Sequence, residues 1–379
     1  MKKVIGFFTD GVPFEGNALE TGSLGGAETA FIQMAKAMTR QGHQVLAINN
    51  SNNPGTYDGV SYHPFRKSLN LLAHTTFDIM VVSRFFGFFS LPIKSRLKVL
   101  WNHDTLDNPQ ALRAIHDEID ICLVLSEFHR HNFLTRLPQL EERTVVTRNG
   151  LDFDLLDRAS RGTAKIPGKL IYASRPERGL KVLLESVWPR LSMNRPDLRL
   201  HLCGYKMADA LSDRSLASLY DYLGLLVSKD PKIVDLGPLP KDEYYRHLAE
   251  AEMMVYPSTF PEVSCLAVLE AQALGTAVVT SDYFALSESV LVPDFKIPGR
   301  PGAKDYLERY VERALTLLSD SDLRKSLSSL AQTKVRARYA WDKVAEEWSR
   351  VFDLALRAKE SRPYFLEVPG NKPLDRLPV

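Results

Sequence analysis

Short apolar runs alternate with amphipathic stretches along most of the chain. Runs such as Val4 to Phe8 and Val45 to Ile48 are the length of buried strands. Stretches such as Glu28 to Met38 place apolar side chains at helical spacing instead. Loops rich in glycine or polar residues separate the two kinds of segment. This alternation predicts an α/β protein with parallel sheets, organised as Rossmann-like units.

The pattern divides the chain into two halves joined by a polar stretch, residues 157–168. Further strands are predicted at 78–83, 99–101, 121–125 and 145–146, and in the second half at 169–173, 198–203, 232–236, 253–256 and 277–280. Helices are predicted at about 210–228, 306–318, 322–338 and 341–356. We therefore expect an N-terminal domain over 1–157 and a C-terminal domain over 165–340.

Composition narrows the function classes. The chain has 379 residues, 45% of them hydrophobic, enough for two cores, and its formal charge of +2 gives no bulk signal for nucleic-acid binding. Its three cysteines form neither a metal pattern nor a disulfide framework. The apolar run at the start is too short for a signal peptide, and no run approaches the roughly 18 residues of a membrane span. We expect a cytoplasmic protein.

One stretch, Pro257 to Thr280, carries the clearest chemistry. It follows a short buried strand, and Pro257 and Pro261 stiffen the loop that comes next. Ser264 is positioned to cap a helix that stops at Gly275, and a second strand then begins. This strand, loop, helix and strand predict a parallel crossover unit whose loop meets the ligand.

Two carboxylates, Glu262 and Glu270, lie in this unit. Eight positions correspond to about two helical turns, so the two groups are poorly placed to share one metal ion. They can instead meet one extended ligand at two points. The backbone N–H groups at the helix start, from Ser264 to Leu266 and including Cys265, suit an anion. The ligand implied is rich in hydroxyls and anionic in its middle. The alternative is a solvated helix face.

A second pair of charges lies in the loop after the strand at 169–173. Arg175 and Arg178 lie just before a helix. Guanidinium groups bind phosphate oxygens in a planar fork, so this loop predicts a clamp for a pyrophosphate. The alternative is a pair of surface arginines that solvate a turn.

These motifs resemble the Glu-x7-Glu signature of retaining glycosyltransferases with the GT-B fold, in particular glycosyltransferase family 4, the glycosyl transferases group 1. The resemblance implies two Rossmann-like domains whose parallel sheets face each other across a cleft. It also implies that the C-terminal helix, about 341–379, crosses back to the N-terminal domain. In that family the first glutamate faces the donor sugar and the second holds the ribose, which assigns these roles to Glu262 and Glu270.

The resemblance extends to the N-terminal half. Gly25 and Gly26, before a helix, match a glycine pair that lies against the donor phosphates in that family. His103 follows a strand, at a place where the family often has a histidine near the donor sugar. The alternative for His103 is a structural role, capping the next helix together with Asp104.

In the C-terminal half, Gly204 and Leu239 match positions near the nucleotide base. Two departures stand out. Arg178 occupies a position where the family usually has lysine, and Phe284–Ala285 replaces a frequent glycine pair before Glu288. The second departure leaves the shape of that loop open.

The expected function is transfer of a sugar from a nucleotide-diphosphate sugar, a UDP-sugar in preference to a GDP-sugar, to a hydroxyl of a glycan, lipid-linked glycan, protein or small molecule. Arg175, Arg178, Glu262 and His103 are the expected catalytic residues, with no cofactor and no metal. Asp152 and Asp154 form an Asp-x-Asp, but they follow a turn and precede a polar helix.

The sequence leaves several alternatives open. A sugar phosphorylase, a nucleotide-sugar epimerase or a non-catalytic nucleotide-sugar-binding subunit could use the same fold. Aromatic and basic residues gather at 84–98 and either fill the N-terminal core or contact an apolar acceptor or the inner face of a membrane. The proline-rich tail after residue 360 is expected to be extended. No feature indicates the oligomeric state.

Overall fold

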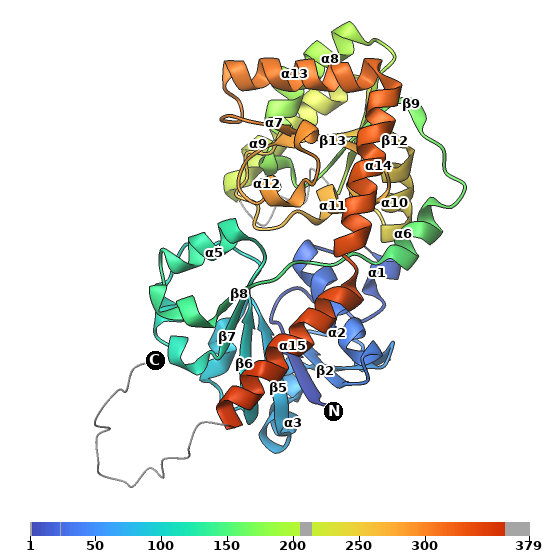
Figure 1. The fold of residues 1–379 in the computed structure, drawn as a ribbon. Helices are drawn as coiled ribbons and strands as arrows, with labels where there is room; N and C mark the ends of the chain where they lie inside the picture. Colours follow the sequence, from blue (N-terminus) through green and yellow to red (C-terminus); the bar gives the residue numbers. More distant parts are fainter. Residues whose placement is uncertain (1, 23, 205–213, 361–379) are drawn as a thin grey trace.

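The structure is a computed structural model that describes residues 2–22, 24–204 and 214–360. Figure 1 shows two lobes, one above the other. The lower lobe is built on an eight-stranded sheet and the upper lobe on a six-stranded sheet. The expectation of an extended tail after residue 360 falls outside the described residues, as does the start of the helix expected from about residue 210.

The lower sheet has the strand order β3-β4-β2-β1-β5-β6-β7-β8 and is parallel except for the β3–β4 pair. Its strands are β1 Val4–Phe8, β2 Gln44–Asn49, β3 Gly55–Tyr57, β4 Val60–Pro64, β5 Phe77–Ser83, β6 Ser95–Trp101, β7 Ile121–Val124 and β8 Thr144–Val146. Sequence analysis did not identify β3 and β4. They are edge strands, and in β4 only two of five residues are buried, so their apolar signal is weak.

Helices cover both faces of the lower sheet. The long helix α2 has nine buried residues and packs on one face together with the C-terminal helix α15. The helices in this part of the chain are α1 Ala18–Thr21, α2 Gly26–Arg40, α3 Leu69–His74, α4 Gln110–Arg113, α5 Glu127–Leu134 and α6 Phe153–Ser160.

The upper sheet has the order β11-β10-β9-β12-β13-β14, and all its pairings are parallel. Its strands are β9 Ile166–Ala173, β10 Arg199–Cys203, β11 Ile233–Gly237, β12 Ala251–Tyr256, β13 Ala277–Ser281 and β14 Lys296–Ile297. The helices of this lobe are α7 Leu180–Val182, α8 Trp188–Asn194, α9 Arg214–Lys229, α10 Lys241–Glu250, α11 Leu266–Ala273, α12 Leu286–Ser289, α13 Lys304–Ser319 and α14 Ser321–Arg338; α15 Trp341–Glu360 follows them in the chain. Strand β14, two residues long, was not predicted.

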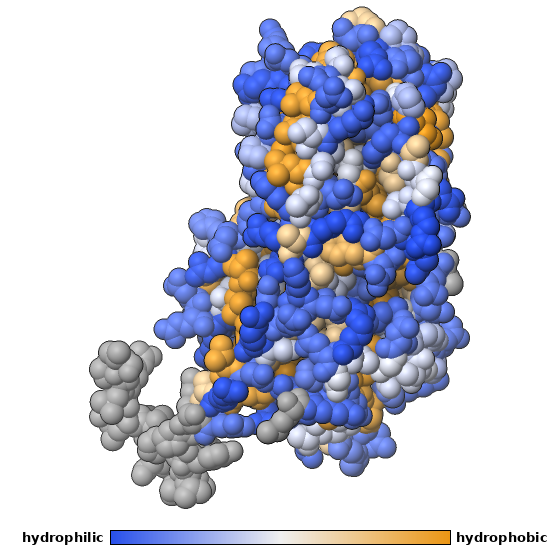
Figure 2. All heavy atoms as spheres, turned by 45° about the vertical axis from the view of Figure 1, so that its right-hand side comes forward, coloured by the Kyte–Doolittle hydropathy of each residue, from blue (hydrophilic) through white to orange (hydrophobic). Residues whose placement is uncertain are grey.

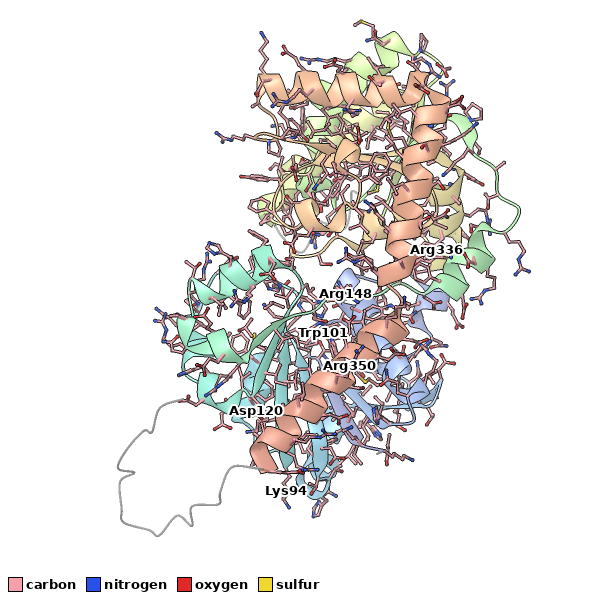
Figure 3. The ribbon with its side chains drawn as sticks, in the orientation of Figure 1. Lys94, Trp101, Asp120, Arg148, Arg336 and Arg350 are labelled. Atoms are coloured by element: carbon pink, nitrogen blue, oxygen red, sulfur yellow. The ribbon has the colours of Figure 1, made fainter. Side chains whose placement is uncertain are left out.

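The chain passes between the lobes twice, and the two crossings lie side by side. The Leu151 amide donates to the Tyr339 carbonyl where they meet. Arg148, labelled in Figure 3, donates to the Arg338 carbonyl at 3.0 Å and pairs with Glu347 at 2.6 Å. One guanidinium therefore links the first crossing to the end of α14 and to α15.

Helix α15 runs diagonally across the lower lobe (Figure 1). Trp348 is 1% exposed, meets the Trp101 ring edge-to-face at 4.8 Å and donates to Thr147 Oγ1 at 2.7 Å. Figure 3 labels Trp101 beside this helix. The last described helix therefore contributes its apolar face to the lower core, although it follows the whole upper lobe in sequence.

Helix α6 packs on α10 of the upper lobe, and Leu151 and Leu156 are buried in the upper core. Only residues 161–165 of the polar stretch expected as a linker lack regular structure. We propose that the domains divide near residue 150, earlier than the expected residue 157, and that α15 completes the N-terminal domain.

Figure 2 shows that hydrophilic residues cover much of one face, with apolar residues visible near the junction of the lobes. Within the described residues, no helix has the length and apolarity needed to cross a bilayer.

Candidate active site

The loop and helix after β12 lie where the two lobes meet. All residues of α11 from Val268 to Ala273 are buried, because this helix packs between β13, α10 and α14. The prediction that Ser264 caps the helix is wrong. Cys265 occupies the cap position without a side-chain capping bond, and Ser264 Oγ instead accepts a 3.4 Å hydrogen bond from Asn149 of the first crossing. The first N–H groups of α11 therefore lack a side-chain cap.

Glu262 is buried and is held from two sides. The Tyr256 hydroxyl donates to its Oε1 at 2.7 Å. Arg178 Nη1 donates to Oε1 at 3.1 Å and to Oε2 at 3.3 Å. Burial, followed by the negative charge of Glu262, raises the pKa of Tyr256 well above its usual value, so the tyrosine remains a protonated donor.

Arg178 reaches Glu262 because two loops cross tightly. Gly179 has φ +134°, and a Cβ there would lie 2.4 Å from the Pro257 carbonyl oxygen, so only glycine fits. The Thr259 amide donates to the Arg178 carbonyl at 3.2 Å, and the Arg178 guanidinium lies 4.0 Å from the centre of the Phe260 ring. The loop after β9 and the loop after β12 thus act as one unit.

Arg175 lies in the same loop but contacts different groups. Its Nε donates to Glu177 Oε1, and Glu177 Oε2 accepts a 2.6 Å hydrogen bond from Tyr220 of α9. The structure therefore brings Arg178 and Glu262 into direct contact and places Arg175 beside Glu177.

Glu270 is also buried, at 2% exposure, and its Oε1 accepts two hydrogen bonds. One comes from Lys241 Nζ at 2.6 Å and the other from the Tyr245 hydroxyl at 2.8 Å, both on α10. Burial and the charge of Glu270 raise the pKa of Tyr245 well above its usual value. Sequence analysis missed Lys241 and Tyr245; their four-residue spacing on one helix face was the only available signal.

Glu270 lies at the contact between the lobes. A cavity of about 10 Å³ is lined by residues from both sides: Leu19, Thr29, Gln33, Gly150, Leu151, Asp152, Leu155, Lys241, Tyr245, Leu266, Glu270 and Trp341. Gly26, at the start of α2, faces α11 so closely that a Cβ there would lie 3.5 Å from Leu266. A space of this size holds about one water molecule, so the two lobes are closed on each other beside Glu270.

A second set of contacts closes the lobes at α5. Ser126 Oγ donates to the Val263 carbonyl at 2.8 Å. The Glu288 carboxylate accepts from the backbone amides of Glu127 at 2.9 Å and Phe128 at 3.0 Å, at the positive end of α5. These contacts tie the loop that carries Glu262, and helix α12, to α5 of the lower lobe, which lies below α12 in Figure 1.

The structure shows the shape of the loop at Phe284–Ala285, where the sequence departs from the glycine pair that the family often has. Phe284 has φ +52°, in the left-handed region that glycine adopts easily, and its ring packs against Phe128 at 4.9 Å. The backbone at Phe284 therefore has the geometry expected for glycine. The Phe284 side chain adds an aromatic contact between the lobes. Sequence analysis missed Ser126 and the role of Glu288 in this contact, because their partners are more than 130 residues away.

His103 follows β6 in the lower lobe. Its Nε2 is buried and has no hydrogen-bond partner within the described part of the chain. Burial, with smaller contributions from Arg84 and His129, lowers the pKa of His103 to about 3, so the ring is neutral. The alternative that His103 and Asp104 cap the next helix is wrong, because that helix begins at Gln110.

The remaining predicted residues lie at strand and helix ends. Gly25 is the cap residue of α2, and a Cβ there would lie 2.5 Å from Glu28 Oε2. Gly204 ends β10 with φ +126° and donates to the Gly237 carbonyl at 3.0 Å. Leu239 follows β11 and packs, partly buried, on the upper core.

The Asp-x-Asp has a structural explanation. Asp152 Oδ1 caps α6 by accepting from the Leu155 amide at 3.0 Å, and Oδ2 accepts from Gln33 at 3.1 Å. Asp154 is exposed on α6. The described residues contain no group of three or more His, Cys, Asp or Glu side chains arranged to hold a metal ion.

Comparisons with known proteins agree with this architecture. Residues 167–320 match the family model described as Glycosyl transferases group 1. A phosphatidyl-myo-inositol mannosyltransferase of Mycobacterium tuberculosis H37Rv is 26% identical over 256 residues. That match covers 64% of this chain and 61% of the mannosyltransferase, so the chain spans about three fifths of the length of that relative.

Solved structures are similar over nearly the whole chain. A sucrose-phosphate synthase of Thermosynechococcus elongatus has a TM-score of 0.71 at 16% identity, covering 94% of this chain and 100% of its own. Anabaena Alr3699/HepE, solved with UDP and glucose, has a TM-score of 0.65 at 16% identity, covering 93% and 100%. The protein thus has the GT-B fold predicted from sequence. Residues 167–320 of its C-terminal half are similar to the glycosyl transferases group 1 family.

Proposed function

We propose that this protein is a retaining glycosyltransferase that transfers a sugar from a nucleotide-diphosphate sugar to an acceptor hydroxyl without a metal ion. The observation that carries the proposal is the buried Glu262, paired with the partly exposed Arg178, and the buried Glu270 that follows eight positions later at the contact between the lobes. Charged groups that are buried at a domain contact, rather than solvated on a helix face, indicate a polar ligand site.

In this proposal Glu262 and Arg178 meet the reacting end of the donor. Arg178, with Arg175 one turn before it, stabilises the charge of the leaving diphosphate, and the N–H groups at the start of α11, which lack a side-chain cap, add to that stabilisation. Glu262, fixed by the Tyr256 hydroxyl, orients the sugar. Retention of configuration then follows from attack by the acceptor on the face from which the diphosphate leaves.

Glu270 anchors the ribose. Its Oε1 is occupied by Lys241 and Tyr245, so we assign Oε2 to the ribose hydroxyls. The base lies toward Gly204 and Leu239. Gly25 and Gly26 approach the phosphates from the lower lobe, and His103, as a neutral imidazole, supports the sugar.

In this proposal, binding involves opening and closing of the lobes. Only about 10 Å³ of space lies between the lobes beside Glu270, so we propose that they separate there to admit the donor. The contacts of Ser126 and Glu288 across the lobes stabilise the closed form. Closure excludes water and limits hydrolysis of the donor.

Several finer assignments rest on support from relatives. Alr3699/HepE was solved with UDP, which favours a UDP-sugar as the donor here. The mannosyltransferase named above acts on a phosphatidyl-myo-inositol by its name, which favours a lipid-linked or glycan acceptor. We propose a cytoplasmic location, with contact to the inner face of a membrane as a further option.

The proposal is tested by measuring melting temperature with UDP-, GDP- and ADP-sugars, since a ligand that binds the folded state raises it. Transfer of the stabilising donor to acceptors is then followed with and without a chelator, and NMR of the product gives the anomeric configuration. Activity lost in chelator would reject metal independence, and an inverted product would reject retention.

Donor incubated alone separates the rival functions. Epimer formation or phosphate-dependent release would indicate an epimerase or a phosphorylase. Strong nucleotide binding without transfer to any acceptor would indicate a non-catalytic subunit.

A further inference from the structure

A second and larger cavity lies in the lower lobe, outside the donor residues described above. Its volume is about 480 Å³, which is in the range of small-molecule sites. It lies at the carboxyl ends of β1 and β5, and its walls are Phe8, Asp10, Phe65, Arg84, Phe85, Phe86, Gly87, Phe88 and Leu91. Six of these nine residues are phenylalanine or leucine.

The apolar wall is built from packed aromatic rings. Phe8 and Phe88 stack with ring centres 3.6 Å apart, and Phe65 meets Phe8 edge-on at 4.9 Å. Phe88 is buried, whereas Phe85 and Phe86 pack on the lower core only partly buried. The expectation that these phenylalanines fill the N-terminal core therefore holds for only some of them. The partly covered rings offer apolar surface to a ligand.

The other end of the cavity is polar and conformationally strained. Arg84 has φ +69°, a backbone conformation that residues other than glycine rarely adopt and that clusters at functional sites. Its guanidinium is held by Asp104 at 2.7 Å and by Glu28 at 3.4 Å. Asp10 lines the same cavity.

These four groups comprise three carboxylates and one guanidinium. The excess of carboxylates over guanidinium groups disfavours a ligand with an anionic head. It suits a ligand with hydroxyl groups, which can donate to a carboxylate and accept from Arg84.

The polar end is continuous with the donor residues. Glu28, which contacts Arg84, lies in the first turn of α2 and reaches back over Gly25. The next residue, Gly26, faces Leu266 at the start of α11. A hydroxyl bound beside Arg84 therefore lies on the side of the cavity that leads to the proposed donor.

We propose that this cavity binds the acceptor, and that the acceptor is amphiphilic and uncharged. Its apolar ring or chain fills the phenylalanine-lined part, and its hydroxyl-bearing head lies between Asp10 and Arg84. This inference rests on the proposed function, because it makes the cavity the acceptor subsite of the transferase.

The test is calorimetric titration of the full-length protein with three glucosides. Phenyl β-glucoside and octyl β-glucoside, the latter below its micelle concentration, share their head with methyl β-glucoside but add an apolar group. We expect at least one of them to bind at least about tenfold more tightly than the methyl compound, because it buries apolar surface that the methyl compound lacks. Equal affinity for all three would overturn the proposal.

Two variants place the binding in this cavity. Phe86→Ala removes part of the apolar wall, and Gly87→Leu adds bulk at a position where a Cβ would meet no atom within 4 Å, so the fold can accept it. Both should weaken phenyl glucoside binding about tenfold, while Met193→Ala, which removes an apolar group 76% exposed on α8, should not. Wild-type affinity in both cavity variants, with melting temperatures that show them folded, would reject the site.

Two further measurements separate the sources of the ligand and the two proposals. Tighter binding of the octyl compound, together with sedimentation of the protein on phosphatidylcholine vesicles, would indicate a membrane lipid as the acceptor. Binding of the phenyl compound alone would indicate a soluble aromatic acceptor. Either result supports an amphiphilic acceptor. UDP binding is measured on the same preparation. UDP binding without glucoside selectivity rejects the acceptor pocket alone, whereas glucoside binding without binding of any nucleotide sugar rejects the acceptor role together with the proposed function.

Discussion

Changing Glu270 to glutamine tests the ribose assignment directly. The substitution keeps the shape of the side chain, and the amide oxygen can still accept from Lys241 and Tyr245, so the fold should persist. What it removes is the negative charge. A hydrogen bond to a charged group contributes about 1 kcal/mol more than a neutral one, so two ribose hydroxyls lose about 2 kcal/mol, which corresponds to about 30-fold weaker UDP binding.

This loss of binding free energy can be measured as a smaller increase in melting temperature on addition of UDP. At a UDP concentration of about 100 times the wild-type Kd, binding stabilises the folded protein by about 2.7 kcal/mol, and a 30-fold weaker Kd leaves about 0.9 kcal/mol. At roughly 3 °C per kcal/mol for a domain of this size, the shift produced by UDP should fall from about 8 °C to about 3 °C.

The matched control is Glu308→Gln, the same chemical change at a side chain 58% exposed on α13. It should show the full UDP shift. If Glu270→Gln also showed the full shift, or bound UDP with unchanged affinity in calorimetry, the ribose assignment would be wrong.

Three further predictions follow from the site and the lower core. Arg178→Ala should lower kcat by about 10²- to 10³-fold, as removal of a charge-stabilising group does. In a Glu262→Gln background the same substitution should lower kcat little further, because the two side chains act as a pair. Fully additive effects in steady-state kinetics would contradict this. Glu288→Gln should destabilise the closed form by about 1–2 kcal/mol, because it removes the charge from two hydrogen bonds between the lobes. X-ray scattering should then show a larger radius of gyration without nucleotide. An unchanged radius would argue against a role of Glu288 in closure. The pKa of His103 is about 3 in the folded protein and 6.5 as its ordinary value, so its contribution to stability is complete above pH 6.5 and is lost as the pH falls toward 3. Between pH 6.5 and 5 the wild type should lose about 2 kcal/mol more in urea unfolding than His103→Asn, and equal losses would refute the assignment.

Sequence alone determined the features that local chemistry controls. Apolar runs such as Met253 to Tyr256, with Pro257 after them, specify a strand and a loop through backbone restraint and burial of short segments. The spacing of Glu262 and Glu270 predicted two carboxylates that meet one ligand, whereas their burial was decided by contacts with residues far away in the chain. The alternation of such units predicted Rossmann-like units, and the resemblance of the motifs to a glycosyltransferase signature predicted the GT-B fold.

Tertiary structure decided everything that depends on distant partners. Ser264 turned to Asn149 instead of capping α11, and Glu288 found the amides at the start of α5, because the lobes meet there. The aromatic stretch at 84–98 was visible in the sequence, but the strained backbone of Arg84 and the cavity beside it arise only where β1, β5 and this stretch pack together. Such contacts join residues far apart in the chain, and only the packing of whole elements brings them within reach.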